Sequence, residues 1–176
     1  MNVRDLTRVA LLAALIALCA WLTIPAPVPF TMQTFAIFLA VGVAGGRRGS
    51  MAVGLYLLLG AVGLPVFAGF QGGVGSLVGT TGGYLVGFLL MALVMWLGQR
   101  LWGEGPAAFF LTGLVGLAVC YLFGTVWFLL LYTRTVGPVS LFGVLGSCVF
   151  PFLAPDVLKL ILALTLRPRL RRALRL

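Results

Sequence analysis

The sequence of 176 residues contains no histidine and only three acidic residues, Asp5, Glu104 and Asp156. Without histidine no Ser-His-Asp catalytic set can form, and three dispersed carboxylates cannot build a metal cluster. The only lysine, Lys159, lacks the glycine before it and the Ser or Thr after it that a phosphate-binding loop requires. We therefore expect neither catalysis nor a cofactor, and any ATP-driven step would need another subunit.

Charge is also scarce, since 9% of the residues are charged and 62% are hydrophobic, with a mean hydropathy of +1.19. That composition leaves too little polar surface for a water-soluble globule, and 24 glycines suit close helix packing in a membrane. The cysteines Cys19, Cys120 and Cys148 stand alone in apolar stretches, which predicts packing roles rather than a disulfide or a metal site. The sequence predicts one all-α membrane domain over residues 1–176.

Six apolar segments, separated by prolines, glycines or charged residues, are candidate membrane helices. The second and third are short, which predicts a recess at one membrane face and hence a place for a ligand. Pro155 is expected in the first turn of the last helix. The first segment has features of a signal peptide, but its length, its proline cluster and the five later segments favour a retained helix. The predicted helices are 6–24, 31–46, 49–62, 82–102, 106–132 and 155–167.

The basic residues predict the orientation of these helices. If the N-terminus is cytoplasmic, ten of the 12 basic residues fall in cytoplasmic segments, only Arg134 is outside, and Lys159 lies within the sixth helix. Both termini are thus expected in the cytoplasm. The basic tail 167–175 is expected to bind anionic membrane lipid rather than nucleic acid. The cytoplasmic set is Arg4, Arg8, Arg47, Arg48, Arg100, Arg167, Arg169, Arg171, Arg172 and Arg175.

The long connections then all lie outside, at residues 25–30, 63–81 and 133–154. Long loops gathered on one face usually carry function. Residues 63–83 contain eight glycines together with Phe67, Phe70, Gln71, Ser76, Thr80 and Thr81. Because its apolar side chains would be poorly placed in water, we expect this segment to fold back as a lid rather than to form a mobile surface loop.

Asp156 and Lys159 are the most informative pair in the sequence. They are three residues apart at the expected start of the sixth helix, so their side chains share a face and can neutralise each other. Ionisable residues inside a membrane usually mark a functional site. The alternative is a structural ion pair in which Asp156 satisfies the helix N-terminus. Because the outer half is otherwise free of charge, we favour a site for a small polar molecule with both donor and acceptor groups.

The first predicted helix carries a strip of small residues. Ala10 with Ala14, and Ala13 with Ala17, form overlapping pairs spaced by four, which lets another helix approach closely. Packing within the chain explains such a strip at least as well as a partner protein does. The strip alone leaves both interpretations open.

Four ordered stretches give the chain a resemblance to a known family over nearly its whole length. They are VPFTMQTF at 28–35, GLPVFAGF at 63–70, TGGYLVGF at 81–88 and PFLAPDVLK at 151–159. The chain resembles BioY, the biotin-specific S components of energy-coupling factor (ECF) vitamin transporters. It departs from the family pattern at Thr80, where the pattern has proline, and at Ala154-Pro155-Asp156, where it has Pro-Gly-Asp.

The resemblance implies a biotin-binding capture subunit with six membrane helices in a bacterial or archaeal cell membrane. It implies that Asp156 and Lys159 hold the ring head of biotin, and that a transmembrane coupling protein and two ATPases are partners. The rival hypotheses are an S component for another vitamin and a membrane scaffold with a structural ion pair. Further contacts are expected from Gln33, Phe67, Phe70, Gln71, Thr81 and Tyr84, and the docking face from Ala10, Ala14 and Ala17.

Overall fold

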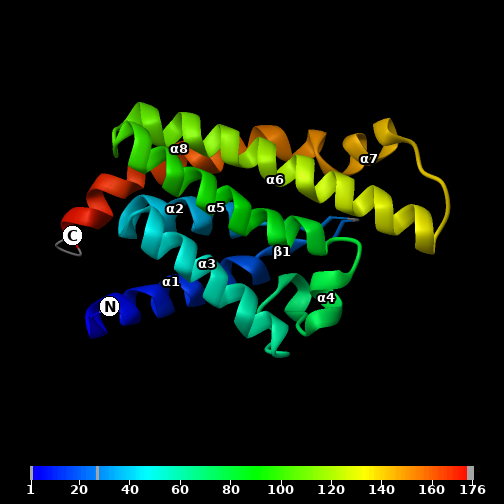
Figure 1. The fold of residues 1–176 in the computed structure, drawn as a ribbon, viewed down its shortest axis with the longest axis horizontal. Coiled ribbons are helices and arrows are strands. Elements are labelled where there is room, and N and C mark those ends of the chain that lie inside the picture. The colour runs from blue at the N-terminus through cyan, green and yellow to red at the C-terminus, as the bar shows by residue number, and fades with distance from the viewer. Residues whose placement is uncertain (1, 27, 174–176) are drawn as a thin grey trace.

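The computed structural model describes residues 2–26 and 28–173, which form a bundle of helices (Figure 1). Its longer helices are α1 (Val3–Trp21), α2 (Gln33–Ala44), α3 (Gly46–Ala61), α5 (Gly82–Trp102), α6 (Pro106–Thr135) and α8 (Phe150–Ala173). The shorter elements are β1 (Thr23–Ile24), β2 (Phe30–Thr31), the 3-10 turn η1 (Ala68–Phe70), α4 (Val74–Val78) and α7 (Leu141–Cys148). The described part of the chain is thus all-α apart from one two-stranded hairpin.

The bundle has two dissimilar ends. In Figure 1 the start of α1, the α2–α3 and α5–α6 turns and the end of α8 lie on the left, and we call this the arginine end. The β1–β2 hairpin, η1, α4 and α7 lie toward the right, at what we call the loop end. The described basic residues predicted to share one side are found in the elements of the arginine end, whereas Arg134 is in the last turn of α6 at the loop end.

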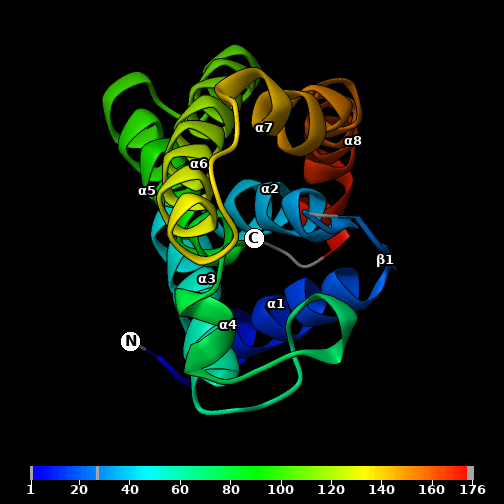
Figure 2. The ribbon, with the colours of Figure 1, turned by 90° about the vertical axis from the view of Figure 1, so that its right-hand side faces the viewer.

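Helix α2 is the core of the bundle. Every residue of α2 except Phe35 is buried. It packs against α1, α3, α5 and α8, and the view along the bundle in Figure 2 shows it near the middle. Its 12 residues give a length of about 18 Å, well short of a hydrocarbon layer of about 30 Å. The predicted shortness of the second helix is confirmed, and the β1–β2 hairpin closes the space beyond its first residue.

Helices α5 and α6 pack along their whole length because glycines bring their backbones together. A Cβ built on Gly87 would lie 2.9 Å from the Cys120 sulfur, and one on Gly124 would lie 2.2 Å from the ring of Tyr84. Such close approach needs glycine rather than alanine. The antiparallel α5–α6 pair therefore forms a rigid wall beside α2 (Figure 2).

Three helical segments among the described residues are long and apolar enough to cross a membrane. They are α5, α6 and the combined segment Leu141–Ala173, which holds α7 and α8. The other three predicted spans correspond to α1, α2 and α3. Helices α2 and α3 are shorter, at 12 and 16 residues, and the start of α1 carries the charged residues Arg4, Asp5 and Arg8. The chain is thus an all-α membrane protein with three clear apolar spans.

The structure corrects several predicted boundaries. The first helix ends at Trp21 rather than at residue 24, because Thr23 and Ile24 pair with Thr31 and Phe30 in the antiparallel hairpin. The third helix begins three residues earlier than predicted, at Gly46, and the fifth continues to Thr135. The fourth helix has the predicted bounds.

The largest error concerns α8. It begins at Phe150, so Pro155 lies inside the helix and not in its first turn, and Pro168 is also internal. The segment predicted as the connection 133–154 holds α7 and the start of α8, separated only at Val149. A proline inside a membrane helix is tolerated when neighbouring groups compensate for the missing N–H, so Pro155 was a misleading signal for the start of the helix.

The buried apolar residues form two clusters. The main one contains most of α2 together with residues of α1, α3, α5 and α6. The smaller one, at the loop end, consists of Val28, Tyr84, Phe128, Val144, Cys148 and Phe152. Cys19, Cys120 and Cys148 are all buried and free, which confirms their predicted packing role.

Candidate functional site

Helix α8 places two charged side chains deep in the bundle. The Nζ of Lys159 lies 2.7 Å from Oδ1 of Asp156, and the residues are 6% and 2% exposed. The prediction that the two share a face and neutralise each other is confirmed. Asp156 is more than one turn inside α8, so it does not satisfy the helix N-terminus, and that part of the structural alternative is wrong.

Two other helices complete the surroundings of the carboxylate. Thr34 of α2 donates to Oδ1 of Asp156 at 2.8 Å, and the Tyr121 hydroxyl of α6 donates to Oδ2 at 2.5 Å. With Lys159, both oxygens have donors, as a buried carboxylate requires. Asp156 is therefore the point where α2, α6 and α8 are joined by polar contacts.

Lys159 is held by the backbone of the hairpin as well as by Asp156. Its Nζ donates to the carbonyl of Thr31 at 2.7 Å and to Oγ1 of Thr34 at 3.3 Å. The ring of Phe30 lies 4.3 Å from the same nitrogen, a cation–π contact. The ammonium thus fixes β2 to α8, although the two are more than 100 residues apart in the sequence.

The polar network continues from the hairpin to α3. The Thr31 hydroxyl donates to Oε1 of Gln33 at 2.8 Å, and Nε2 of Gln33 donates to the Tyr56 hydroxyl at 2.6 Å. Gln33 is 2% exposed, so its amide is largely committed to contacts within the chain. Its predicted role as a binding residue would require one of these bonds to be exchanged.

Two small cavities flank this network at the loop end. One, of about 40 Å³, is lined by Asp156, Lys159 and Tyr121 and lies between the two apolar clusters. The other, of about 60 Å³, is lined by five of the predicted site residues, namely Gln33, Phe67, Gln71, Thr81 and Tyr84. The cavities share Val28, Pro29, Tyr84 and Phe88. The structure therefore brings seven of the eight predicted site residues around two adjoining cavities.

Phe70 is the exception, and the local backbone explains why. Gly69 and Phe70 both have positive φ, at 68° and 58°, in a turn where the Phe67 N–H donates to the Gln71 carbonyl at 2.9 Å. This turn directs Phe67 inward, where it is 2% exposed, and leaves Phe70 64% exposed with its ring stacked 5.0 Å from that of Trp21. The structure does not bring Phe70 to the cavities.

Phe67 is the buried apolar side chain with which the glycine-rich segment 63–81 covers the site. Phe67 lies edge-on against Tyr56 at 5.4 Å, and it fits because residue 60 is glycine: a Cβ there would be 1.9 Å from the Phe67 ring. The expectation that the other apolar side chains of the segment would be covered is wrong for several of them. Exposed residues include Leu64, Phe70, Val74 and Val78.

The predicted alanine strip on α1 divides between surface and core. Ala10 and Ala14 are exposed, whereas Ala13 and Ala17 are 1% and 8% exposed and belong to the main apolar cluster. Ala17 therefore contributes mainly to packing within the chain, and only the Ala10 and Ala14 pair presents a small-residue surface.

Sequence reasoning missed several residues of the polar network around the charged pair. Thr34, Tyr121 and Tyr56 come from three helices, and no spacing rule relates them to Asp156. The available signal was their polarity, since hydroxyl groups within apolar spans need partners. That signal indicates that such residues make polar contacts, but it does not identify the residues they contact.

A charged pair buried among apolar helices beneath an irregular segment defines a class of protein: membrane proteins that hold a small polar solute between their helices. The comparisons give the family. The model of the BioY family matches residues 1–176. The chain therefore belongs to the BioY family, as its sequence motifs predicted, and so to a family of transporter components rather than of enzymes.

Individual relatives agree with that assignment. The chain is 41% identical over 170 residues to the biotin transporter BioY of Thermotoga maritima, with 96% of each chain covered. It is 40% identical over 173 residues to the biotin transporter BioY2 of Lactococcus lactis, covering 97% of this chain and 91% of the relative. A crystal structure of the S-component for biotin from an ECF-type ABC transporter superposes with a TM-score of 0.84 at 28% identity, covering 97% and 92% of the two chains.

Proposed function

We propose that this chain is the biotin-capturing S component of an ECF-type transporter and that Asp156 and Lys159 hold the head of the vitamin. The observation that carries the site assignment is the buried 2.7 Å ion pair beside two cavities. The names of its relatives and of the similar solved structure support biotin as the substrate.

The chemistry of the pair suits a cyclic urea. A ureido ring has N–H donors on either side of a carbonyl acceptor, so Asp156 accepts from an N–H while Lys159 donates to an oxygen. Because burial removes competing water, each such hydrogen bond discriminates strongly against a ligand that lacks the matching group. The rings of Phe67 and Tyr84, which line the second cavity, supply the apolar walls for the rest of the molecule.

The volumes imply that the site opens to admit its ligand. Sites for small organic ligands enclose roughly 300 to 1,000 Å³, whereas the two cavities measure about 60 and 40 Å³. Movement of segment 63–81, led by Phe67, would join them across their shared lining. Gln71 and Thr81 belong to this segment and would approach the bound ligand as the segment closes.

The orientation and assembly belong to the same proposal. We place the arginine end in the cytoplasm on the basis of its charge, so that α1, α2, α3, α5, α6 and α8 form six membrane helices of a single domain, 1–176, with both termini inside. The tail 167–175, of which Arg175 lies outside the described residues, would contact anionic lipid. Ala10 and Ala14, with Ala17 behind them, would face a coupling protein that carries two ATPases.

The first test is equilibrium binding of labelled biotin to the detergent-purified chain, with desthiobiotin, thiamine and riboflavin as competitors. Saturable binding near one biotin per chain, displaced by desthiobiotin alone, is the expected result. Displacement by thiamine or riboflavin would assign the site to another vitamin, and absence of saturable binding in a folded sample would favour a scaffold.

A separate experiment tests the orientation. Single cysteines placed at Ser140, at the loop end, and at Arg169, at the arginine end, should differ in labelling by a membrane-impermeant thiol reagent added to intact cells. We expect labelling at 140 and not at 169. The reverse pattern would invert the proposed topology without affecting the site.

A further inference from the structure

The arginine end contains a basin that the biotin site does not explain. Two cavities, of about 330 and 340 Å³, adjoin there and share Ala44, Gly45, Arg48 and Glu104. Both are larger than the cavities beside Asp156. We propose that this basin binds the phosphate group of an anionic phospholipid, with Arg47 and Arg100 as its principal ligands.

The charges in the basin are unbalanced in a specific way. Its acids already have partners: Asp5 lies 3.0 Å from Arg48, and Glu104 lies 2.6 Å from Arg171. Arg47 and Arg100 line the first cavity but form no ion pair among the described residues. These two guanidinium groups are surplus positive charges facing one space, which favours an anion with several oxygen acceptors.

The basin is rigidly built, which distinguishes it from a diffuse basic surface. Gln99 of α5 is 9% exposed and accepts from the Gly46 N–H at 2.6 Å, so it ties the start of α3 to α5. A Cβ on Gly46 would lie 2.5 Å from the Cα of Trp96, so the two backbones are in direct contact. Arg47 and Arg100 are thereby carried on elements fixed relative to each other, and the N-terminus of α3 adds to the positive potential.

The surroundings favour a lipid over a soluble anion. On α5, one and two turns from the basin, Leu97 and Leu93 are 57% and 38% exposed, and the adjacent Leu101 and Trp102 are 67% and 65% exposed. An acyl chain can lie along this apolar face while its phosphate occupies the basin. Inorganic phosphate and a lipid headgroup would make the same contacts with the arginines. The experiment must therefore distinguish a bound lipid from a bound soluble phosphate.

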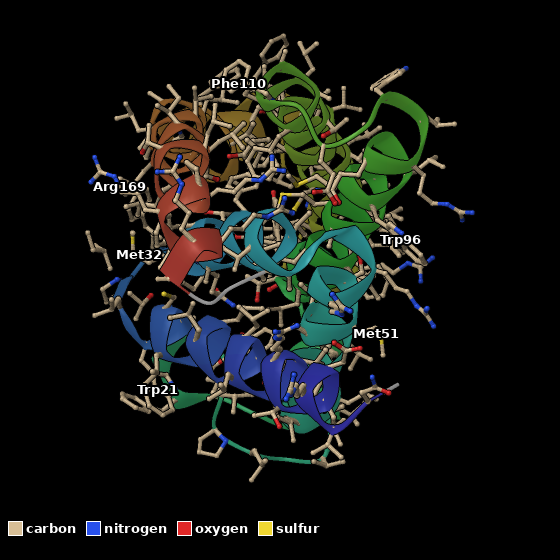
Figure 3. The ribbon with its side chains drawn as sticks, turned by 90° about the vertical axis from the view of Figure 1, so that its left-hand side faces the viewer. Trp21, Met32, Met51, Trp96, Phe110 and Arg169 are labelled. Carbon is tan, nitrogen blue, oxygen red and sulfur yellow. The ribbon has the colours of Figure 1, made fainter. Side chains whose placement is uncertain are left out.

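The experiment compares two double variants of the full chain that remove equal charge. Arg47→Gln with Arg100→Gln alters the basin, whereas Arg169→Gln with Arg172→Gln alters exposed residues of α8 that line neither cavity. Figure 3, drawn from the arginine end, shows Arg169 on the opposite side from Trp96 and Met51, which line the basin. Binding of phosphatidylglycerol and phosphatidylcholine to each purified protein would be measured by native mass spectrometry.

We expect one tightly bound phosphatidylglycerol per chain and an affinity about thirty-fold lower in the Arg47 and Arg100 variant, since each arginine contributes roughly five-fold. The Arg169 and Arg172 variant should stay within about two-fold, because the contact of the tail 167–175 with anionic lipid is a diffuse attraction to the membrane surface and not a site for a single headgroup. Biotin binding should be unchanged in both, which shows that they are folded. Equal losses in the two variants, or no preference for phosphatidylglycerol over phosphatidylcholine, would overturn the proposal. So would displacement of the lipid by equimolar inorganic phosphate, which would assign the basin to a soluble anion.

Discussion

Helix α8 carries two charged clusters, and they differ in almost every physical respect. At the loop end Asp156 and Lys159 have side chains that are 3% and 7% exposed, with donors and acceptors from α2, α6 and the hairpin. At the arginine end Glu104 is 48% exposed and binds the half-buried Arg171 at 2.6 Å, and its contact with the buried Arg167 is longer, at 3.5 Å. The first cluster is enclosed by helices, whereas the second closes a turn at the surface.

The difference indicates what each cluster is for. An exposed ion pair contributes about 0 to 1 kcal/mol, whereas removing one member of a buried pair costs about 3 to 5 kcal/mol because the other is left uncompensated. A buried pair is therefore an expensive way to stabilise a helix, and apolar residues of similar size would often do as well. This asymmetry supports the proposed role of the pair at the loop end in ligand binding.

The largest expected effect comes from Asp156→Asn. This substitution keeps the shape of the side chain but leaves the Lys159 ammonium without its counter-charge. We expect biotin affinity to fall at least about a hundred-fold and the free energy of unfolding to fall by about 3 to 5 kcal/mol. Labelled-biotin binding and thermal unfolding in detergent measure the two effects.

The double variant Asp156→Asn with Lys159→Met separates the two effects. With both charges gone, much of the lost stability should return, because no uncompensated charge remains. Biotin binding should not return. Wild-type affinity in either variant would remove Asp156 from the site.

The second effect in size comes from Tyr121→Phe, which deletes the 2.5 Å hydrogen bond to Oδ2 of Asp156. A hydrogen bond to a charged group contributes about 1.5 to 3 kcal/mol, so we expect biotin affinity to fall about ten-fold. The matched control is Tyr132→Phe on the same helix, where the ring stacks on Phe128. Equal affinities in the two variants would mean that Tyr121 does not orient the carboxylate.

A smaller effect is expected from Gly60→Ala, which displaces Phe67 from Tyr56 and leaves all charged groups unchanged. The added methyl group would overlap the Phe67 ring, at a cost of about 1 to 3 kcal/mol in stability. We expect about a five-fold weaker affinity because segment 63–81 closes less well. Gly54→Ala on the same helix, where nothing lies within 4 Å, is the control. If both alanine variants bound biotin like the parent, Phe67 would not contribute to closure.

The smallest effect should come from Glu104→Gln, the same isosteric change as Asp156→Asn applied to the exposed cluster. The free energy of unfolding should change by no more than about 1 kcal/mol, and less at high salt, because the carboxylate is half exposed and screened. The buried Arg167 keeps its 2.8 Å hydrogen bond to the Glu104 backbone carbonyl. Biotin affinity should stay within about two-fold. Thermal unfolding at low and high ionic strength checks the first statement. A loss of binding comparable to that of Asp156→Asn would erase the distinction between the clusters.

Local signals in the sequence were sufficient for part of the fold. The bounds of α5 were predicted correctly because glycines flank it on both sides and its interior is uniformly apolar. Those of α8 were not, because Pro155 was taken as a first-turn residue, whereas the neighbouring helices allow it inside the helix. Whether a proline marks the end of a helix or lies inside it depends on tertiary contacts that the sequence does not display.

The site shows the same limit. Asp156 and Lys159 could be paired from their spacing alone, because an i,i+3 relation is a property of one helix. Thr34 and Tyr121 could not, because their positions beside the carboxylate depend on how three helices pack. Phe70 was included as an aromatic wall residue on the strength of the family resemblance, but the positive φ of Phe70 turns its ring outward.

The three contacts of Lys159 have a consequence for how a ligand is chosen. An ammonium group has three N–H bonds, and here the Thr31 carbonyl, the Thr34 hydroxyl and Asp156 accept all of them. An incoming oxygen can therefore gain a bond only by exchange, most readily with Thr34 at 3.3 Å. Exchange yields little net energy, so tight binding must come from the apolar body of the ligand. The polar head acts instead as a filter, because a molecule that opens this network and cannot replace the lost bond is rejected.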